Sequence, residues 1–213
     1  MSRAARAGTA GIALALSLVA AAGLHAGEYN QVVDIGAPLP EFENLPATDG
    51  TTLSSGDLKE EVVVLVFLAN HCPWVKGMDG DLVELVDGLA GMDVRVVGVS
   101  VNHMEADRLP AMEEHGKKVG YNFTYIYDES QELGRQLGAT RTPEYFVFDG
   151  DRRLAYMGLL HDSPAMMRGD GSVNYTNGDP STFYVRDAVD ALLAGEGVAE
   201  AETRAQGCSV KYE

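Results

Sequence analysis

The chain has 213 residues, of which 46% are hydrophobic and 23% charged, and its formal net charge at pH 7 is −16. This length suits one domain with a hydrophobic core, and the composition excludes disordered, collagen-like and coiled-coil proteins. The acidic balance argues against nucleic acid and anionic membranes as partners, and two cysteines are too few for a disulfide-rich scaffold or an all-cysteine zinc site.

Residues 1–26 have the pattern of a secretory signal peptide. Arg3 and Arg6 precede an apolar run over 11–24, and the segment contains no acidic residue. Because the run is short for a membrane span, we expect cleavage and a periplasmic or secreted protein with no membrane span in its mature chain. The alternative is an uncleaved N-terminal anchor. Cleavage leaves 14 basic and 32 acidic residues, a net charge of −18. Export would place the two cysteines where disulfides persist.

The first predicted strand is the apolar, β-branched run 62–68, which is typical of a central strand buried on both faces. A second apolar strand is expected over 94–101, and a strand–helix–strand unit implies a right-handed parallel crossover. Gly77, Gly80 and Gly88 weaken the helix between them, each by about 1 kcal/mol against Ala. Helical spacing nevertheless assigns that helix an apolar face of Val75, Met78, Leu82, Leu85, Val86 and Leu89.

Shorter elements follow in the second half of the chain. A helix is expected over 110–119, with proline in its first turn, then a strand over 122–127 and a helix over 130–137. Residues 145–148 and 154–157 flank an Asp-Gly turn, which predicts an antiparallel hairpin.

The remaining chain is an insertion, a helix and a tail. Residues 161–180 are polar and turn-rich, and we expect a long irregular insertion there. Ser181 is expected to cap a last helix whose apolar face is Val185, Val189 and Leu192. The chain therefore divides into the signal peptide, one domain over 27–195 and a tail over 196–213. The fold class is α/β, a central mixed sheet flanked by helices with a C-terminal antiparallel hairpin and helix.

Cys72 is the residue most suited to chemistry. It lies just beyond the carboxyl end of the first buried strand, the edge at which open α/β sheets bind ligands. Pro73 favours the first turn of a helix, so we expect Cys72 at a helix N-terminus, where unpaired N–H groups and the helix dipole stabilise a thiolate. The alternative is a buried, inert cysteine.

The run Phe67-Leu68-Ala69-Asn70-His71-Cys72-Pro73-Trp74-Val75-Lys76, Thr142-Pro143 and the hairpin together resemble the thioredoxin-like superfamily, in its redoxin branch (AhpC/TSA and TlpA/ResA-like proteins). The resemblance covers roughly residues 35–195 by the order of elements. The Asn-His-Cys-Pro motif and a terminal Gly-Cys-x-x-Lys are similar to those of a bacterial thioredoxin-family subgroup. The resemblance implies a thioredoxin-like fold, antioxidant or disulfide-exchange activity, and no cofactor.

The chain departs from two patterns of that superfamily. Thioredoxins carry Cys-x-x-Cys, but Val75 stands where the second cysteine would be. Peroxiredoxins carry a threonine or serine three residues before the reactive cysteine and a proline further upstream, where this chain has Ala69 and Leu65. Both the dithiol and the usual peroxidatic pocket are therefore altered.

The resemblance also implies a cis bond between Thr142 and Pro143, which leaves the preceding backbone free to pair with an extended peptide beside the thiol. The alternative is an ordinary trans proline. Cys208, the other thiol, is a candidate resolving cysteine that attacks a mixed disulfide or sulfenic acid on Cys72. A static structural bridge, an intermolecular bridge and a free thiol remain open, because sequence does not fix connectivity.

Three further residues are candidates for binding substrate. His71 adjoins the thiol and is suited to stabilising a thiolate or moving a proton, with a solvated loop histidine as the alternative. Arg141 precedes Thr142 and is suited to approaching the thiol, or it lies on the surface. Trp74 either forms an aromatic lip over the thiol or simply packs. No metal site is expected, since the histidines at 103, 115 and 161 lack metal-binding spacing.

The leading hypothesis is an exported thiol oxidoreductase that exchanges disulfides or reduces peroxides. Its catalytic cysteines are Cys72 and Cys208, and its partners are a disulfide-bearing protein or a peroxide and an external thiol reductant. Disulfide exchange is preferred to peroxide reduction. The alternative is a thioredoxin-like module that binds a partner or a metal ion without turnover, which the valine at position 75 favours.

Overall fold

A computed structural model describes Met1 and residues 27–213, so the predicted signal peptide lies outside the described residues. Its main element is a five-stranded sheet in the order β5-β4-β3-β7-β8. Neighbours β3, β4 and β5 run parallel, whereas β7 and β8 run antiparallel, which confirms the predicted mixed sheet with its hairpin. The strands are β3 (Val62–Phe67), β4 (Val94–Ser100), β5 (Thr124–Tyr127), β7 (Glu144–Phe148) and β8 (Leu154–Gly158).

Strand β3 lies at the centre because it is apolar on both faces. All six of its residues are buried, and they alternate between two hydrophobic cores, one on each side of the sheet. An aliphatic strand of this kind gains most from burial when both faces are covered. Its carboxyl end at Phe67 leads through residues 68–71 to Cys72, so the centre of the sheet fixes the position of the thiol.

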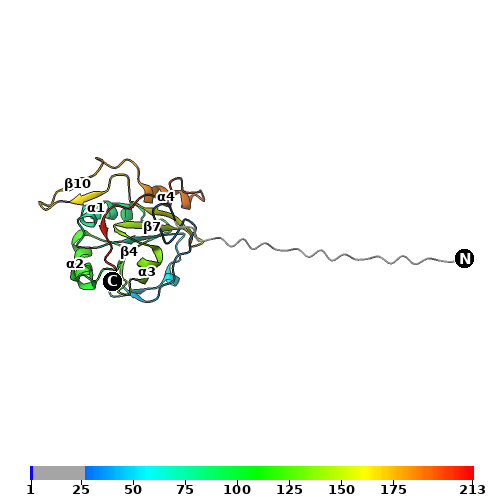
Figure 1. Cartoon of the computed structure of the whole chain (residues 1–213), viewed down its shortest axis with the longest axis horizontal. Helices are drawn as coiled ribbons and strands as arrows, with labels where there is room; N and C mark the ends of the chain where they lie inside the picture. The colour runs from blue at the N-terminus through cyan, green and yellow to red at the C-terminus, as the bar shows by residue number, and fades with distance from the viewer. Residues whose placement is uncertain (2–26) are drawn as a thin grey trace.

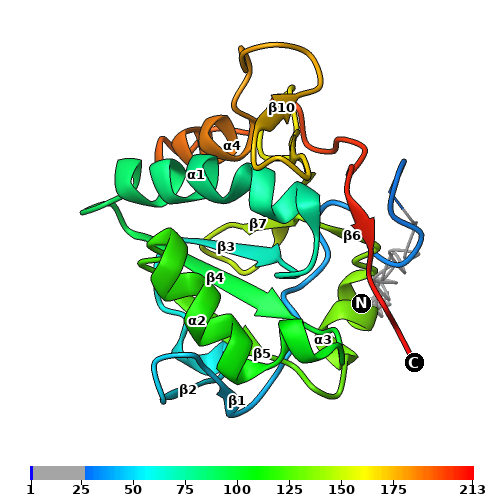
Figure 2. The ribbon, with the colours of Figure 1, turned by 90° about the vertical axis from the view of Figure 1, so that its left-hand side faces the viewer.

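Four helices cover the sheet, and Figure 2 shows α1 and α4 side by side on one face. Buried side chains of α1, α2 and α4 join the core on this face, whereas Leu133 and Leu137 of α3 belong to the core on the other face. The predicted buried positions Val185 and Val189 are confirmed. The helices are α1 (Pro73–Gly88), α2 (Leu109–Val119), α3 (Glu132–Leu137) and α4 (Tyr184–Leu193).

Two expectations about residues 161–183 were wrong. The insertion is partly regular, because β9 (Ala165–Met167) and β10 (Val173–Tyr175) pair as a hairpin; Figure 1 shows β10 extending from the body of the domain. Phe183, not Ser181, stands at the N-cap of α4. The Ser181 hydroxyl instead donates to Asp162 Oδ2 at 2.5 Å, so it closes the insertion rather than capping the helix.

The other elements are short and lie around this frame. Near the N-terminal side, β1 and β2 form a small hairpin, and β6 and β11 pair at the edge next to Cys72. Within residues 27–213, no helix has both the length and the apolar character needed to cross a membrane. The short elements are β1 (Leu45–Pro46), β2 (Thr52–Leu53), η1 (Ser55–Asp57), η2 (Glu105–Asp107), β6 (Arg141–Thr142) and β11 (Cys208–Ser209).

Candidate active site

Cys72 is the N-cap residue of α1, as its sequence context predicts. A residue before proline avoids the helical region, so Cys72 is extended (φ −75°, ψ 122°) and the helix begins at Pro73. Its carbonyl accepts the Lys76 N–H at 3.0 Å, and its thiol donates to the carbonyl oxygen of Thr142 at 3.2 Å. The exposed fraction of Cys72 is 0%. The thiol therefore lies at a helix N-terminus, but beneath a cover.

Part of that cover is the C-terminal tail. Strand β11 pairs antiparallel with β6, and the register places Cys208 opposite Thr142, the residue whose carbonyl accepts the Cys72 thiol. Both cysteines are free thiols, and Cys208 is half-buried. Two residues 136 positions apart in sequence thus meet at one carbonyl group. Figure 2 shows this strand, in red, beside β6.

Cys208 is held as a protonated thiol in this arrangement. Burial, and then the neighbouring Cys72 thiol, raise the pKa of Cys208 to about 12. The backbone N–H of Trp74, in the first turn of α1, opposes the shift. The amide groups of the helix N-terminus therefore act on the second cysteine as well as lying beside the first.

His71 is fixed by a carboxylate that the sequence analysis did not identify. Its backbone N–H donates to Asp107 Oδ1 at 3.1 Å, and its Nδ1 lies 2.6 Å from Asp107 Oδ2. The Asp107 side chain is fully buried in η2, whereas the His71 side chain is 21% exposed. With Nδ1 bound to the carboxylate, Nε2 is the nitrogen left for chemistry. No local pattern marked Asp107, because it lies in a short 3-10 turn.

The other predicted substrate-binding residues lie in β6, directly after it and in the first turn of α1. The Thr142–Pro143 bond is cis, as expected. Thr142 is buried, and the Arg141 guanidinium donates to Ser209 Oγ at 2.5 Å, so Arg141 links β6 to the tail. Trp74 is half-buried and packs against the same core as Cys72 and Cys208. Val75, at the position of the missing second cysteine, is a core residue with 1% exposure.

Glu144 is a second buried carboxyl group that the sequence analysis missed. It begins β7, directly after Pro143, and it accepts the backbone N–H groups of Thr140 at 2.7 Å and Arg141 at 2.9 Å. Burial raises the pKa of Glu144 to about 7 against the opposing effect of these two hydrogen bonds. A charged residue at the head of the apolar run 145–148 was the available signal.

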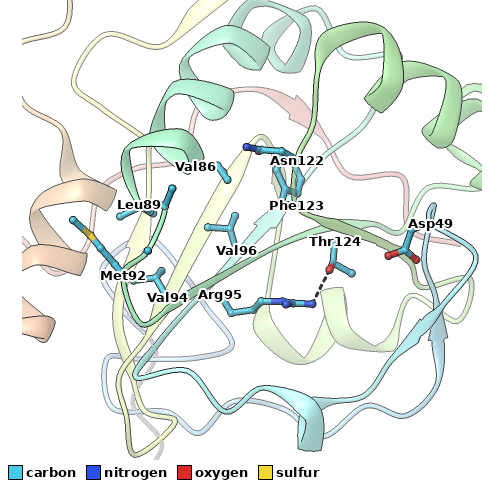
Figure 3. Close-up of a pocket in the computed structure, with 12 residues that line it drawn as sticks. Asp49, Val86, Leu89, Met92, Val94, Arg95, Val96, Asn122, Phe123 and Thr124 are labelled. Carbon is cyan, nitrogen blue, oxygen red and sulfur yellow. Dashed lines mark hydrogen bonds between the residues drawn. The ribbon is translucent and has the colours of Figure 1, made fainter.

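Two further observations concern the surroundings of the thiols: a hollow that lies apart from them, and the absence of a metal-binding group among residues 27–213. Leu89, Arg95 and Phe123, which Figure 3 labels, belong to the lining of a hollow of about 480 Å³ at the amino ends of β4 and β5. Cys72 follows the carboxyl end of β3, so this hollow is separate from the thiols. Across residues 27–213, histidine, cysteine and acidic side chains form no group of three or more suited to a metal ion.

Comparisons with known proteins agree with this geometry. A family model described as Redoxin matches residues 34–170. The structure of an uncharacterized conserved protein from Geobacillus kaustophilus is 33% identical to this chain, with a TM-score of 0.75, and the match covers 84% of this chain and 93% of that one. A hypothetical protein from Sinorhizobium meliloti 1021 is 28% identical, with a TM-score of 0.73 and coverage of 86% and 97%.

A more distant structure carries a functional description. A thiol:disulfide interchange protein of the thioredoxin family from Chlorobium tepidum TLS is 22% identical, with a TM-score of 0.54 and coverage of 75% of this chain and 98% of that one. At this identity the likeness shows the fold alone, and it confirms the expected thioredoxin-like fold. No curated protein in the comparison matches the chain.

Proposed function

The chain belongs to the redoxin family, and on that premise we propose that it is an exported thiol oxidoreductase with Cys72 as nucleophile and Cys208 as resolving thiol. The observation that carries the proposal is the β6–β11 register, which puts Cys208 opposite the residue that accepts the Cys72 thiol. A resolving cysteine must be able to reach the first sulfur, and Cys208 packs against the same core cluster that contains Cys72.

The proposed reaction transfers two electrons from the cysteines to a disulfide on a protein partner. The Cys72 thiolate attacks one partner sulfur, the partner's S–S bond breaks, and the leaving thiolate takes up a proton. Cys208 then loses its proton and attacks the Cys72 sulfur, which releases the second partner thiol. The partner disulfide is reduced to two thiols while a Cys72–Cys208 disulfide forms.

The raised pKa of Cys208 sets the order of the two reaction steps. While Cys72 is a thiolate, its negative charge adds to the effect of burial and keeps Cys208 protonated. A mixed disulfide on Cys72 carries no charge, so that part of the shift disappears. Cys208 therefore becomes a better nucleophile only after the first step. An external dithiol then regenerates the enzyme, and its accessible target is the half-buried Cys208 rather than the buried Cys72.

Peroxide reduction is the second reaction that the same pair supports. The Cys72 thiolate attacks the terminal peroxide oxygen, the O–O bond breaks, and the products are a sulfenic acid on Cys72 and an alcohol or water. Cys208 then attacks the sulfenic sulfur, and water leaves as the disulfide forms. Ala69 and Leu65, which replace the usual peroxidatic residues, favour disulfide exchange over this reaction. Stopped-flow mixing with hydrogen peroxide and with a disulfide substrate measures which reaction is faster.

Mass mapping of the cysteines tests the two-cysteine cycle. We expect a Cys72–Cys208 linked peptide after oxidation of the wild type and its disappearance after treatment with dithiothreitol. In Cys208→Ser, a mixed disulfide with the substrate should accumulate on Cys72; in Cys72→Ser, none should form. Absence of both the linked peptide and the mixed disulfide would overturn the proposal.

A binding module without turnover is the alternative, and the complete burial of Cys72 favours it. On this reading the same edge holds a partner or a metal ion, and the thiol stays inert. Titration of the Cys72 thiol by its absorbance at 240 nm, in a Cys208→Ser background, discriminates the two. An ordinary free-thiol value of about 8.5, with no trapped mixed disulfide, would favour the binding module. Metal that copurifies with the protein would favour it further.

Export is part of the proposal, and it rests on residues 1–26 alone. Cell fractionation with N-terminal sequencing of the mature protein tests it. We expect the chain in the periplasm or medium, with its first residue near position 27. A chain recovered in the membrane with residue 1 intact would indicate an uncleaved anchor instead.

A further inference from the structure

The C-terminal tail lies on β6 in the manner of a bound peptide. Cys208 pairs with Thr142 and Ser209 with Arg141, and the Val210 N–H donates to the Thr140 carbonyl at 3.0 Å. The addition of an extended segment to an exposed strand edge is a common mode of peptide recognition, in which backbone hydrogen bonds supply affinity and alternate side chains supply specificity. Here the chain's own tail takes the place of the added segment.

Both ends of this tail segment fit their surroundings closely. A Cβ atom on Gly207 would lie 2.1 Å from the Thr142 carbonyl oxygen, so only glycine permits this approach. Val210, two residues after the cysteine, is 9% exposed and packs into the core that contains α3. The edge thus selects a small residue before the cysteine and an aliphatic residue two positions after it.

Hydrogen bonds of Lys211, Tyr212 and Glu213 hold the rest of the tail in place. The Lys211 N–H donates to Asn102 Oδ1 at 2.8 Å, and the Lys211 carbonyl accepts from Gln131 Nε2 at 2.8 Å. The Glu213 N–H donates to Gln131 Oε1 at 2.9 Å, and the Tyr212 hydroxyl donates to the Ala139 carbonyl at 2.7 Å. These contacts anchor the seated strand beyond the cysteine.

A strand edge holds one partner at a time. With the tail seated, the edge of β6 is occupied and the exposed fraction of Cys72 is 0%. An external disulfide therefore has no route to the Cys72 sulfur while residues 207–210 remain paired. Residues 207–210 therefore cover Cys72 and carry the resolving thiol. The edge of β6 on which they lie is also the binding edge for a substrate strand.

We propose that residues 207–210 are a built-in competitor that occupies the edge of β6, so that the tail must leave before an extended cysteine-bearing segment of a protein partner can pair there. This inference rests on the proposed function and adds a regulatory step to it. The tail leaves, the partner segment pairs with β6, and its cysteine occupies the place of Cys208. Once the mixed disulfide on Cys72 has formed, the returning tail displaces the partner segment and brings Cys208 to the Cys72 sulfur.

Alkylation of Cys72 tests the cover without any need for turnover. All variants carry Cys208→Ser, so that Cys72 is the single thiol. We expect iodoacetamide to modify the full-length protein slowly, and deletion of 207–213 to accelerate the reaction at least about tenfold, as expected when a local opening is no longer required. Val210→Pro, which removes the N–H donor to Thr140, should accelerate it in the full-length chain; Gln206→Ala, at an exposed position, should not.

A peptide added in trans tests the competition. The peptide spans residues 206–213 with Cys208→Ser, and it should restore protection to the deletion variant in a saturable manner, whereas a scrambled peptide should not. Equal alkylation rates with and without the tail would overturn the proposal. So would acceleration in the deletion variant alone, with Val210→Pro unchanged and no protection by the peptide, because destabilisation would then explain the rate. If protection behaves as expected but no mixed disulfide forms on Cys72, the tail inference stands and the proposed oxidoreductase activity fails.

Discussion

At the scale of single residues, Asp107 and His71 behave as one unit. The buried carboxylate binds both the backbone N–H and the Nδ1 of His71, and this geometry fixes which imidazole nitrogen is free. Asp107 does not need to touch the substrate to matter. We regard it as a positioning residue for the histidine that adjoins Cys72.

Asp107→Asn retains an acceptor for the His71 N–H but removes the carboxylate that fixes the imidazole. We expect the rate of mixed-disulfide formation at Cys72 to fall roughly tenfold, at the low end of the usual contribution of acid–base groups. The measurement is a double-mutant cycle with His71→Ala, read by stopped-flow. The double variant should be no slower than His71→Ala alone. Fully additive losses would contradict the positioning role.

The buried Glu144 makes the folding stability of the protein depend on pH. Its pKa is 4.5 in the unfolded chain and about 7 in the folded protein, so the folded state binds the proton more tightly. Its contribution to stability is therefore fully present below pH 4.5 and is lost as the pH rises through 7. At 1.36 kcal/mol per unit, the loss is on the order of 3 kcal/mol.

Glu144→Gln should abolish this loss. We expect the variant to be more stable than the wild type at pH 8 and to differ less from it at pH 4.5, as measured by urea denaturation at each pH. The difference between the two proteins isolates Glu144, since His103, whose pKa is also raised, is common to both. A difference that is constant with pH would contradict the assignment.

At the scale of elements, two of the three glycines in α1 have different surroundings. A Cβ on Gly77 would lie 2.6 Å from the Ala165 carbonyl oxygen, because β9 crosses the helix at this point. A Cβ atom on Gly80 would meet nothing within 4 Å outside its own helix, and Gly80 is exposed. Gly77 weakens the helix but makes room for the insertion. The close approach of β9 also places the Ala165 N–H 3.0 Å from Met78 Sδ.

The two glycines should respond oppositely to alanine. We expect Gly80→Ala to stabilise the protein by about 0.5–1 kcal/mol through helix propensity. Gly77→Ala should destabilise it by about 1–3 kcal/mol, because the methyl group forces β9 away. Urea unfolding at one pH measures both changes. The idea of close packing fails if both variants gain stability.

At the scale of the whole molecule, the C-terminal tail contacts both residues 28–30, near the N-terminal side, and the first turn of α1. The Glu202 carboxylate accepts backbone N–H groups of residues 28–30, and Cys208 lies against the first turn of α1. Oxidation of Cys72 and Cys208 would close a covalent loop around most of the sheet. Redox state is therefore expected to act on global stability.

We expect the oxidised protein to be more stable than the reduced protein by about 2–4 kcal/mol, because the link restricts the unfolded chain. Guanidinium unfolding of both forms measures this, after mass spectrometry has verified the link. Cys208→Ser treated with the same oxidant serves as control and should show no gain. Equal or lower stability of the linked form would indicate that the pair cannot close without distorting β6 and β11.

The sequence alone determined the elements whose causes are local. The run 62–68 predicts a buried central strand, because uninterrupted aliphatic residues fit only a strand covered on both faces. The Cys72-Pro73 pair predicts a helix start, because proline excludes the helical conformation from the residue before it. The hairpin and the helix faces follow in the same way from periodicity and turn residues.

Only the tertiary structure decided the contacts between distant segments. Sequence reasoning named Cys208 as a candidate, but its place opposite Thr142 depends on a strand register that no local pattern encodes. Asp107 and Glu144 are acidic residues like 30 others in the chain, and their burial together with their hydrogen bonds to His71 and to the backbone of residues 140–141 distinguishes them. The physical reason is common to all three: side-chain environment is set by packing between segments far apart in sequence, whereas composition and periodicity report only on the segment itself.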